Sequence, residues 1–279
     1  MGRVEGKVAF VTGAARGQGR SHAVRLAEEG ADIIAVDLCA QIDGVPYPMS
    51  VPEDLDETVR QVEALDRRIV ARVADVRDVA GLAGAVADGL AELGRLDIVC
   101  ANAGILGPYR EIRDVGERVA LFEQVVDVNL TGVFRTVEVA KQALIDSGGG
   151  GSVVITSSLA GLRAIGVRGG YTEAKHGLVG LARTYARELA PHMIRVNSIH
   201  PTNVATPMIL NDETARAFLS GIEAPGEKDV ERALSFLNLL PIPYVEARDI
   251  SNAVLWLASD EARYVTGVAL PVDAGAAIK

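Results

Sequence analysis

The chain has 279 residues, of which 49% are hydrophobic, so it is long enough for one large domain with a sizeable buried core. Its formal net charge is -9 and its pI is about 5.1, which argues against nucleic acid or an anionic membrane as the main partner. Its two cysteines imply no disulfide framework, and no apolar run resembles a signal peptide or a membrane span. We therefore expect a cytoplasmic protein.

Short β-branched runs alternate along the chain with longer segments rich in alanine and leucine. The predicted strands are near-continuous apolar runs, as in parallel strands covered on both faces, and comprise residues 7–11, 32–36, 69–74, 96–101, 152–156, 194–199 and 268–271. The predicted helices comprise residues 20–29, 79–93, 117–147, 171–189 and 247–259. This alternation predicts a single α/β domain over residues 1–279, with a doubly wound parallel sheet of about seven strands.

Two connections are unusually long for this pattern. Residues 39–56 contain Pro46, Pro48 and Pro52, and we expect an extended loop before a helix near residues 57–65. Residues 202–244 separate two strands, and connections of this length are usually lids, binding loops or disordered linkers. Because residues 212–220 and 230–239 have helical spacing, we expect a partly helical substrate lid.

The first predicted strand is followed by a glycine-rich turn, Thr12-Gly13-Ala14-Ala15-Arg16-Gly17-Gln18-Gly19. Glycines permit close approach of the backbone to a pyrophosphate, and a helix that begins near Gly17 offers free amides to that anion. Asp37 ends the second strand, where its carboxylate can accept both hydroxyls of an adenine ribose and would repel a 2′-phosphate. Although Arg16 could reach such a phosphate, Asp37 favours NAD over NADP.

Further polar residues follow the next strands. Asn102-Ala103-Gly104 follows the fourth strand and Asp75-Val76 the third, at the edge where open α/β sheets bind ligands, so Asp75 could meet the adenine amino group. Asn129 lies inside a helical pattern, where it can distort the helix and free a carbonyl to hold water, or simply be a satisfied polar residue. The four histidines show no metal-ligand spacing with cysteines or carboxylates, so we predict no metal site.

A tyrosine and a lysine stand four residues apart in Tyr171-Thr172-Glu173-Ala174-Lys175, on one face of a predicted helix. A nearby ammonium favours the phenolate, which would lower the pKa of Tyr171 from about 10 and suit it to acid/base chemistry near neutral pH. Upstream, Ser157-Ser158 closes an apolar strand and could present a hydroxyl to the same reacting oxygen. No Gly-x-Ser-x-Gly elbow is present, which disfavours a hydrolase.

Together these residues resemble the short-chain dehydrogenase/reductase family, from Lys7 to about Asp273. The matching motifs are Thr12-Gly13-x-x-x-Gly17-x-Gly19, Asn102-Ala103-Gly104, Asn129, Ser158, Tyr171-x-x-x-Lys175 and Pro201. The resemblance implies a Rossmann-type fold in which Tyr171 is the general acid/base and Lys175 lowers its pKa and binds the nicotinamide ribose. It also implies that Ser158 orients the substrate oxygen and that Asn129 holds a water in a proton relay. Ser158 is selected over Ser157 because it precedes Tyr171 by thirteen positions, the usual spacing in the family.

The resemblance also implies a set of cofactor contacts. Val204 and Thr206, which follow Pro201, would contact the nicotinamide carboxamide. The predicted cofactor-binding residues are Gly13, Arg16, Gly17, Gln18, Gly19, Asp37, Leu38, Asp75, Val76, Asn102, Ala103, Gly104, Tyr171, Lys175, Val204 and Thr206.

The sequence departs from the usual family pattern in three places. Gln18 stands where isoleucine is usual, Thr202 replaces the glycine that often follows Pro201, and the connection from Asp37 to Asp75 is longer than expected. With the segments 17–22 and 200–208, this longer connection resembles the mycofactocin-associated subfamily, which includes carveol dehydrogenase-like enzymes. That resemblance implies that NAD stays bound and that a separate redox partner reoxidises it.

The proline-containing loop bears on the same point. It leaves the strand that ends at Asp37, so it starts beside the adenosine half of NAD, and its prolines lower the entropy cost of ordering it. We expect the loop to cover the cofactor and slow its release, with an inert surface excursion as the alternative.

Two functions remain open from the sequence. The first is an NAD-dependent oxidoreductase that interconverts a secondary alcohol and its ketone by hydride transfer. The second is a non-catalytic NAD-binding regulator or scaffold on the same fold, which would not need Asn129, Ser158, Tyr171 and Lys175 together. An enoyl reductase is disfavoured because it would typically use a different tyrosine–lysine spacing.

Apolar residues suggest the substrate and the assembly. Those of the lid indicate an apolar substrate, such as a terpenoid or steroid, or else they only pack the lid or a subunit interface; they are Phe218, Phe236, Leu237, Leu239, Leu240 and Ile242. Helices 117–147 and 171–189 have more apolar faces than one sheet layer needs, and residues 268–277 are apolar to the end. We therefore predict a homo-oligomer, which the family resemblance implies is a tetramer.

Overall fold

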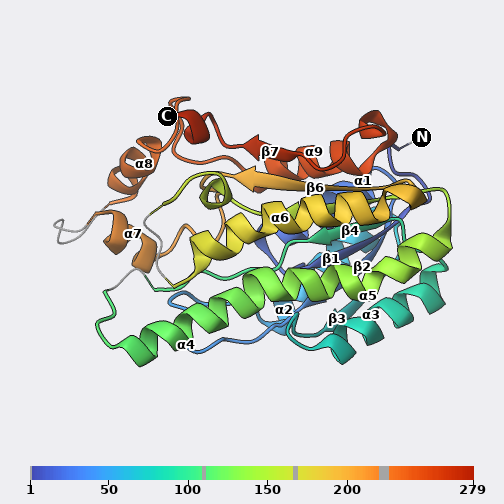
Figure 1. Cartoon of the computed structure of the whole chain (residues 1–279), viewed down its shortest axis with the longest axis horizontal. Coiled ribbons are helices and arrows are strands. Elements are labelled where there is room, and N and C mark those ends of the chain that lie inside the picture. The colour runs from blue at the N-terminus through green and yellow to red at the C-terminus, as the bar shows by residue number, and fades with distance from the viewer. Residues whose placement is uncertain (1, 109–110, 166–168, 220–225) are drawn as a thin grey trace.

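The computed structural model describes residues 2–108, 111–165, 169–219 and 226–279, with residues 217, 218 and 227 described by their backbone alone. These residues form a seven-stranded parallel sheet with strand order β3-β2-β1-β4-β5-β6-β7 (Figure 1). The predicted fold class is confirmed, and each predicted strand agrees with the observed one to within two residues at either end. The strands are β1 (Val8–Thr12), β2 (Asp32–Asp37), β3 (Ile69–Val73), β4 (Ile98–Ala101), β5 (Gly151–Thr156), β6 (Ile194–Pro201) and β7 (Ala269–Val272).

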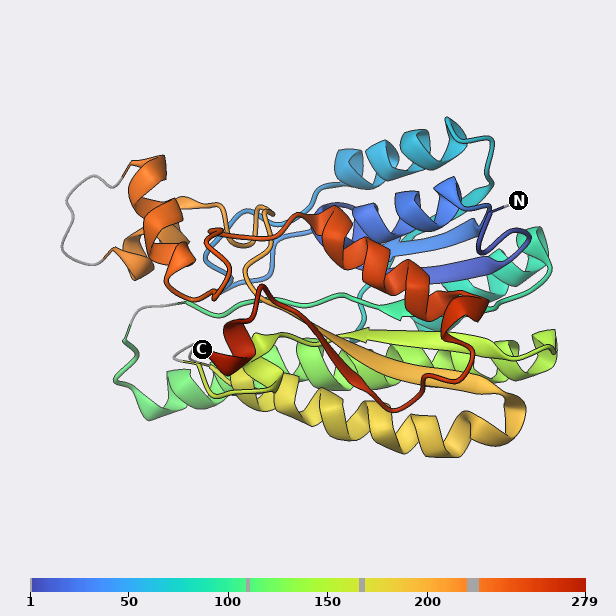
Figure 2. The same ribbon diagram turned by 90° about the horizontal axis from the view of Figure 1, so that it is seen from above.

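Helices cover both faces of the sheet. Helices α3, α4, α5 and α6 pack in one hydrophobic cluster and α1, α2 and α9 in another, with the sheet between them (Figures 1 and 2). Successive residues of β1 alternate between these clusters, because Val8 and Phe10 belong to the first and Ala9 and Val11 to the second. The helices are α1 (Gly17–Glu28), α2 (Pro52–Glu63), α3 (Val79–Leu93), α4 (Val115–Val126), α5 (Gly132–Ser147), α6 (Tyr171–Leu189), α7 (Asp212–Phe218), α8 (Glu227–Ser235) and α9 (Ala247–Ala258).

The predicted start of α2 is wrong by one turn or more. The helix begins at Pro52 rather than near residue 57, so the preceding loop ends at Val51. Proline fits the first helical position because the N–H that it lacks would have no partner within the helix there. The carboxylate of Asp54 accepts the N–H of Val51 at 3.0 Å and completes the helix start.

The predicted helix over residues 117–147 is divided in the structure. Helices α4 and α5 are joined by a π-helical segment, Asp127–Thr131, which contains Asn129. The side chain of Asn129 is fully buried, and it accepts the N–H of Ile105 at 2.7 Å and donates to the carbonyl of Ile105 at 2.8 Å. The helix is thus distorted where the asparagine predicts it, and the side chain is satisfied by the segment that follows β4.

The long connection between β6 and α9 contains α7 and α8, which project beyond the carboxyl ends of the strands (Figure 2). Its base is closed by a bridge between Val204 and Val245. Its last part packs on the C-terminal turn, because the N–H groups of Leu239 and Leu240 both donate to the carbonyl of Ala274 at 3.0 Å. Among the described residues, no helix is long and apolar enough to cross a membrane.

Candidate active site

A cleft lies at the carboxyl edge of the sheet, beside β1 and β4, where the strand order changes direction. It encloses about 890 Å³, part of which is open to solvent. Thirteen of the predicted cofactor-binding residues line it, namely Gly13, Arg16, Gly17, Gln18, Gly19, Asp37, Leu38, Asp75, Val76, Asn102, Ala103, Gly104 and Thr206. The structure therefore brings together residues from five separate connections of the chain.

The glycine-rich turn requires glycine for two steric reasons. Gly13 has a φ of +69°, and a Cβ there would lie 2.9 Å from the Cα of Ala103. A Cβ at Gly19 would lie 1.9 Å from the carbonyl oxygen of Gly13. The turn therefore packs tightly against the segment after β4, and α1 begins at Gly17 with its first amides beside the cleft.

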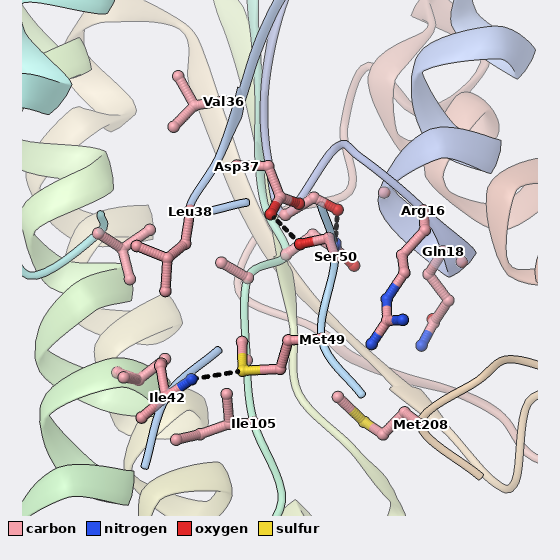
Figure 3. Close-up of a pocket in the computed structure, with 18 of the residues that line it drawn as sticks. Arg16, Gln18, Val36, Asp37, Leu38, Ile42, Met49, Ser50, Ile105 and Met208 are labelled. Carbon is pink, nitrogen blue, oxygen red and sulfur yellow. Dashed lines mark hydrogen bonds between the residues drawn. The ribbon is translucent and has the colours of Figure 1, made fainter. Parts of the chain in front are cut away.

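Asp37 is held by three donors from the protein. Its side chain accepts the N–H of Ala15 at 2.9 Å, the N–H of Cys39 at 3.1 Å and the hydroxyl of Ser50 at 2.6 Å. Figure 3 shows Asp37 and Ser50 on one side of the cleft, with Arg16 and Gln18 extending from the other. The hydrogen bonds fix the orientation of the carboxylate: Oδ1 accepts from Cys39 and Ser50, whereas Oδ2, among the described residues, accepts only from Ala15 and retains capacity for a ribose hydroxyl.

The loop after β2 forms a wall of this cleft. Its position is fixed by the guanidinium of Arg16, which donates to the carbonyl of Pro48 at 2.6 Å, and by the hydroxyl of Tyr47, which accepts the N–H of Leu106 at 3.1 Å. Besides the predicted Leu38, the loop contributes four residues to the lining of the cleft, namely Ile42, Tyr47, Met49 and Ser50. None of them was singled out from the sequence, although the prolines and the position after Asp37 place the loop itself correctly.

Asp75 lines the cleft but is already paired. Arg77 donates to its carboxylate from Nε at 2.9 Å and from Nη2 at 2.6 Å. Burial acts to raise the pKa of the Asp75 carboxyl, but the hydrogen bonds and charge of Arg77 outweigh it, so the pKa is lowered. An ionised Asp75 can still accept a hydrogen bond from an amino group.

The tyrosine–lysine pair lies at the start of α6. Tyr171 is the first residue of the helix, and the ammonium of Lys175 lies 5.6 Å from the centroid of its ring. Lys175 is 3% exposed and donates to the carbonyl of Thr156 at 2.8 Å, at the end of β5. Burial lowers the pKa of Lys175 to about 8, so its positive charge is present at neutral pH and close to being lost.

The two serines after β5 have different surroundings. The hydroxyl of Ser157 is buried and donates to the carbonyl of Lys175 at 2.9 Å, which ties the strand to α6. The hydroxyl of Ser158 is only half-buried and accepts the N–H of Ala160 at 3.1 Å, so its own proton is available for another acceptor. This difference favours Ser158 as the residue that faces a substrate.

Gly104 is the junction between the cleft and the polar residues around Tyr171. It lines the cleft, and a Cβ added to it would lie 3.2 Å from Oδ1 of Asn129 and 3.6 Å from Nζ of Lys175. Asn129 and Lys175 thus lie behind Gly104, and neither they nor Ser158 and Tyr171 are among the residues that line the cleft. Val204 is buried in the cluster around α9 and does not line the cleft, whereas Thr206 does.

This arrangement fits an extended dinucleotide. The glycine turn and the first amides of α1 suit a pyrophosphate, and the carboxylate of Asp37 suits the adenine ribose. Gly104 lines the same cleft, with Asn129 and Lys175 beside it. A glycine-rich turn at a helix start and a carboxylate at the end of the second strand are typical of dinucleotide-binding proteins.

The chain belongs to the short-chain dehydrogenase/reductase family. A family model described as enoyl-(acyl carrier protein) reductase matches residues 13–277. A protein of Mycolicibacterium smegmatis described as a short-chain type dehydrogenase/reductase is 56% identical over 279 residues, which cover 100% of this chain and 99% of the relative. The predicted family is confirmed.

Particular relatives have narrower descriptions. The (-)-trans-carveol dehydrogenase of Rhodococcus erythropolis is 50% identical over 279 residues, covering 100% of both proteins. The crystal structure of carveol dehydrogenase from Mycobacterium avium in complex with NAD is 54% identical, covers 100% of both chains and superposes with a TM-score of 0.96. Levodione reductase of Leifsonia aquatica is 35% identical over 98% of this chain and 95% of its own.

Proposed function

We propose that this protein is an NAD-dependent alcohol dehydrogenase that interconverts an apolar secondary alcohol and its ketone, with Tyr171 as the acid/base. Membership of the family and relatives that are named as carveol dehydrogenases support the oxidoreductase class. The observation that carries the proposal is the pairing of Tyr171 with Lys175, which lies with Asn129 beside Gly104, a residue that lines the same cleft as Asp37. NAD as the cofactor agrees with two relatives whose structures contain it.

The residues of this chain divide the reaction between them. The Asp37 carboxylate and the amides at the start of α1 would hold NAD, which supplies the acceptor for the hydride of the alcohol carbon. The hydroxyl of Ser158 orients the substrate oxygen, and Tyr171 removes the proton from that oxygen. Lys175 stabilises, through its charge, the Tyr171 phenolate that accepts this proton and becomes a neutral phenol, and Asn129 would begin the proton relay.

The loop formed by residues 38–51 supports slow release of the cofactor. It contributes Ser50 to Asp37 and accepts a hydrogen bond from Arg16 of the glycine turn, so it spans both walls of the adenosine end of the cleft. On its outer side, Gln124 of α4 donates to the carbonyl of Asp43 at 2.8 Å. We infer that NAD must displace an anchored segment to leave, which agrees with the proposed mycofactocin-associated subfamily and an external redox partner.

The apolar substrate class is supported by the edge of the cleft. Pro207 and Met208, near the start of the connection to α9, line it with apolar side chains, and Figure 3 shows Met208 in that position. In the lid, Phe236, Leu239 and Leu240 are each more than half exposed, whereas the side chain of Phe218 lies outside the described residues. We propose that residues 202–244 cover the bound alcohol, as the name of the carveol dehydrogenase relative suggests for a terpenoid.

A homotetramer is supported by exposed apolar side chains on α4 and α5. Val119 and Phe122 of α4 are 49% and 42% exposed, and Phe134 of α5 is 46% exposed. Near the C-terminus, Tyr264 and Ile278 are each 83% exposed. Exposed apolar side chains on several parts of one chain suit an assembly with more than one kind of twofold contact.

The experiment that tests the proposed function is Tyr171→Phe. The phenol is used for proton transfer, so turnover should fall by about 10²–10⁴-fold while NAD binding stays nearly unchanged. Turnover would be measured with a panel of apolar secondary alcohols, carveol among them, by following nicotinamide reduction. Activity within about tenfold of the unmodified protein would contradict the assignment of Tyr171.

A further inference from the structure

A buried histidine makes a hydrogen-bonded connection to the backbone of Ser158. His200 lies near the end of β6, is 0% exposed, and has its Nδ1 at 2.8 Å from the carbonyl oxygen of Ser158. Its Nε2 lies 2.8 Å from the hydroxyl of Ser198, which points to the same face of the strand two residues earlier. Both ring nitrogens are therefore used, one of them by the residue that presents the substrate-facing hydroxyl.

The chemistry of the partners defines the protonation of the ring. A carbonyl oxygen only accepts, so Nδ1 must carry a proton and donate it to Ser158. Burial lowers the pKa of His200 to about 4, so the ring is neutral near pH 7 and Nε2 accepts the hydroxyl proton of Ser198. The carbonyl of Ser158 thus fixes the tautomer, and the hydroxyl of Ser198, which can donate or accept, completes it by donating to Nε2.

We propose that His200 is a positioning residue for the alcohol–ketone reaction, because its Nδ1–H holds the Ser158 backbone and so aims the Ser158 hydroxyl at the reacting oxygen of the substrate. The inference rests on the proposed function. The backbone of Ser158 is extended, with φ of -169° and ψ of 166°, and it opens the short 3-10 helix Leu159–Gly161. The same carbonyl accepts the N–H of Gly161 at 2.8 Å. His200, which lies on β6, therefore supplies a second donor to this carbonyl and ties the turn to the sheet.

Two substitutions of His200 distinguish the effect of the Nδ1–H donor from the effect of the volume of the ring. In His200→Asn the amide nitrogen can occupy the place of Nδ1 and donate to Ser158, whereas in His200→Gln the amide reaches the place of Nε2 instead. We expect H200Q to lower the single-turnover rate of nicotinamide reduction by about ten- to a hundredfold, as expected for misplacing a reacting group by about 1 Å. We expect H200N to keep most of the rate, and Ser198→Ala to give a smaller loss than H200Q, because Nε2 loses its partner while Nδ1–H still faces the carbonyl of Ser158.

The decisive measurement is a double-mutant cycle with Ser158→Ala, at saturating NAD and alcohol. If His200 acts through the Ser158 hydroxyl, H200Q adds no further loss of rate once that hydroxyl is absent. Equal losses in the two backgrounds would overturn the positioning role and show a general effect on the fold. If H200Q does not fold, S198A takes its place in the cycle, and its loss of rate is compared in the same way with and without the Ser158 hydroxyl.

His22 provides a matched control. It is also fully buried, burial lowers its pKa to about 3, and its Nδ1 lies 2.8 Å from the hydroxyl of Ser251 in the contact between α1 and α9. His22→Gln should lower the melting temperature as H200Q does, but leave the rate per bound NAD unchanged. If the wild-type protein fails to reduce NAD with every alcohol of the panel, the proposed function itself is refuted. If the wild-type protein is active but the rate losses of H200Q and Ser158→Ala are additive, only the role of His200 is refuted.

Discussion

Replacing Lys175 by methionine should stabilise the protein while it inactivates the site. The ammonium of Lys175 is 3% exposed, and burial lowers its pKa from an ordinary value of 10.5 to about 8. That difference corresponds to about 3 kcal/mol that the charged form costs the folded state at neutral pH. Loss of the hydrogen bond to Thr156 offsets about 1 kcal/mol, which leaves a net gain of about 2 kcal/mol, or about 4 to 8 °C in melting temperature.

The sign of the pH dependence follows from the lowered pKa. Between about pH 8 and pH 10.5 the unfolded state binds more protons at this position than the folded state, so the wild-type protein gains stability from this group as the pH rises. Lys175→Met lacks the group and gains nothing from it. The difference in melting temperature should therefore be largest at pH 7 and shrink toward pH 10.

The assay is thermal unfolding of nucleotide-free protein at matched concentration, with turnover measured alongside. Lys228→Met is the control, because Lys228 is an exposed residue of α8 and its replacement should change the melting temperature little at any pH. A Lys175→Met protein that is less stable than wild type at pH 7, or a difference that does not shrink with pH, would refute the reasoning.

Three other outcomes are expected. Asp37→Ala should weaken NAD binding and raise the ratio of NADP to NAD use, because the carboxylate that excludes a 2′-phosphate is removed; an unchanged ratio in steady-state kinetics would contradict its role as ribose ligand. Replacing residues 45–52 by a short Gly-Ser linker should speed NAD dissociation by about an order of magnitude, because Tyr47 and Ser50 no longer anchor the loop, and an unchanged off-rate in stopped flow would exclude a clamp. Light scattering at micromolar concentration should show a tetramer. Phe134→Glu should dissociate the tetramer, because it places a charge on an exposed apolar surface. A monomeric wild-type protein would contradict the prediction of an oligomer.

The elements that the sequence predicts best are those with strong local signals. The observed bounds of α3 and α6 equal the predicted ones, since α3 has Asp78 as its N-cap and Gly94 after its end. The start of α2 was missed because Pro52 suits both a loop and the first turn of a helix. Local patterns cannot separate these two uses of proline without the neighbours that the fold supplies.

The residues of the site divide in a similar way. Gly13, Asp37 and Asn102 could be predicted because each follows a strand in the order that parallel sheets impose. Tyr47 and Ser50 could not, because they reach the cleft through the tertiary course of a loop with no repeating pattern. The hydrogen bonds of His200 could not be predicted either, since the use of its two ring nitrogens depends on where the fold places Ser158 and Ser198.

The π-helical segment between α4 and α5 has a consequence for how this protein can change in length. A π turn holds one residue more than an α turn, and each residue of a helix rotates its successor by about 100°. Deleting one residue from Asp127–Thr131 would let this turn close as a regular α-helix and keep the phase of α5, but it would withdraw Asn129 from Ile105. A single deletion there would therefore remove a buried polar contact of the site while leaving the path of both helices intact.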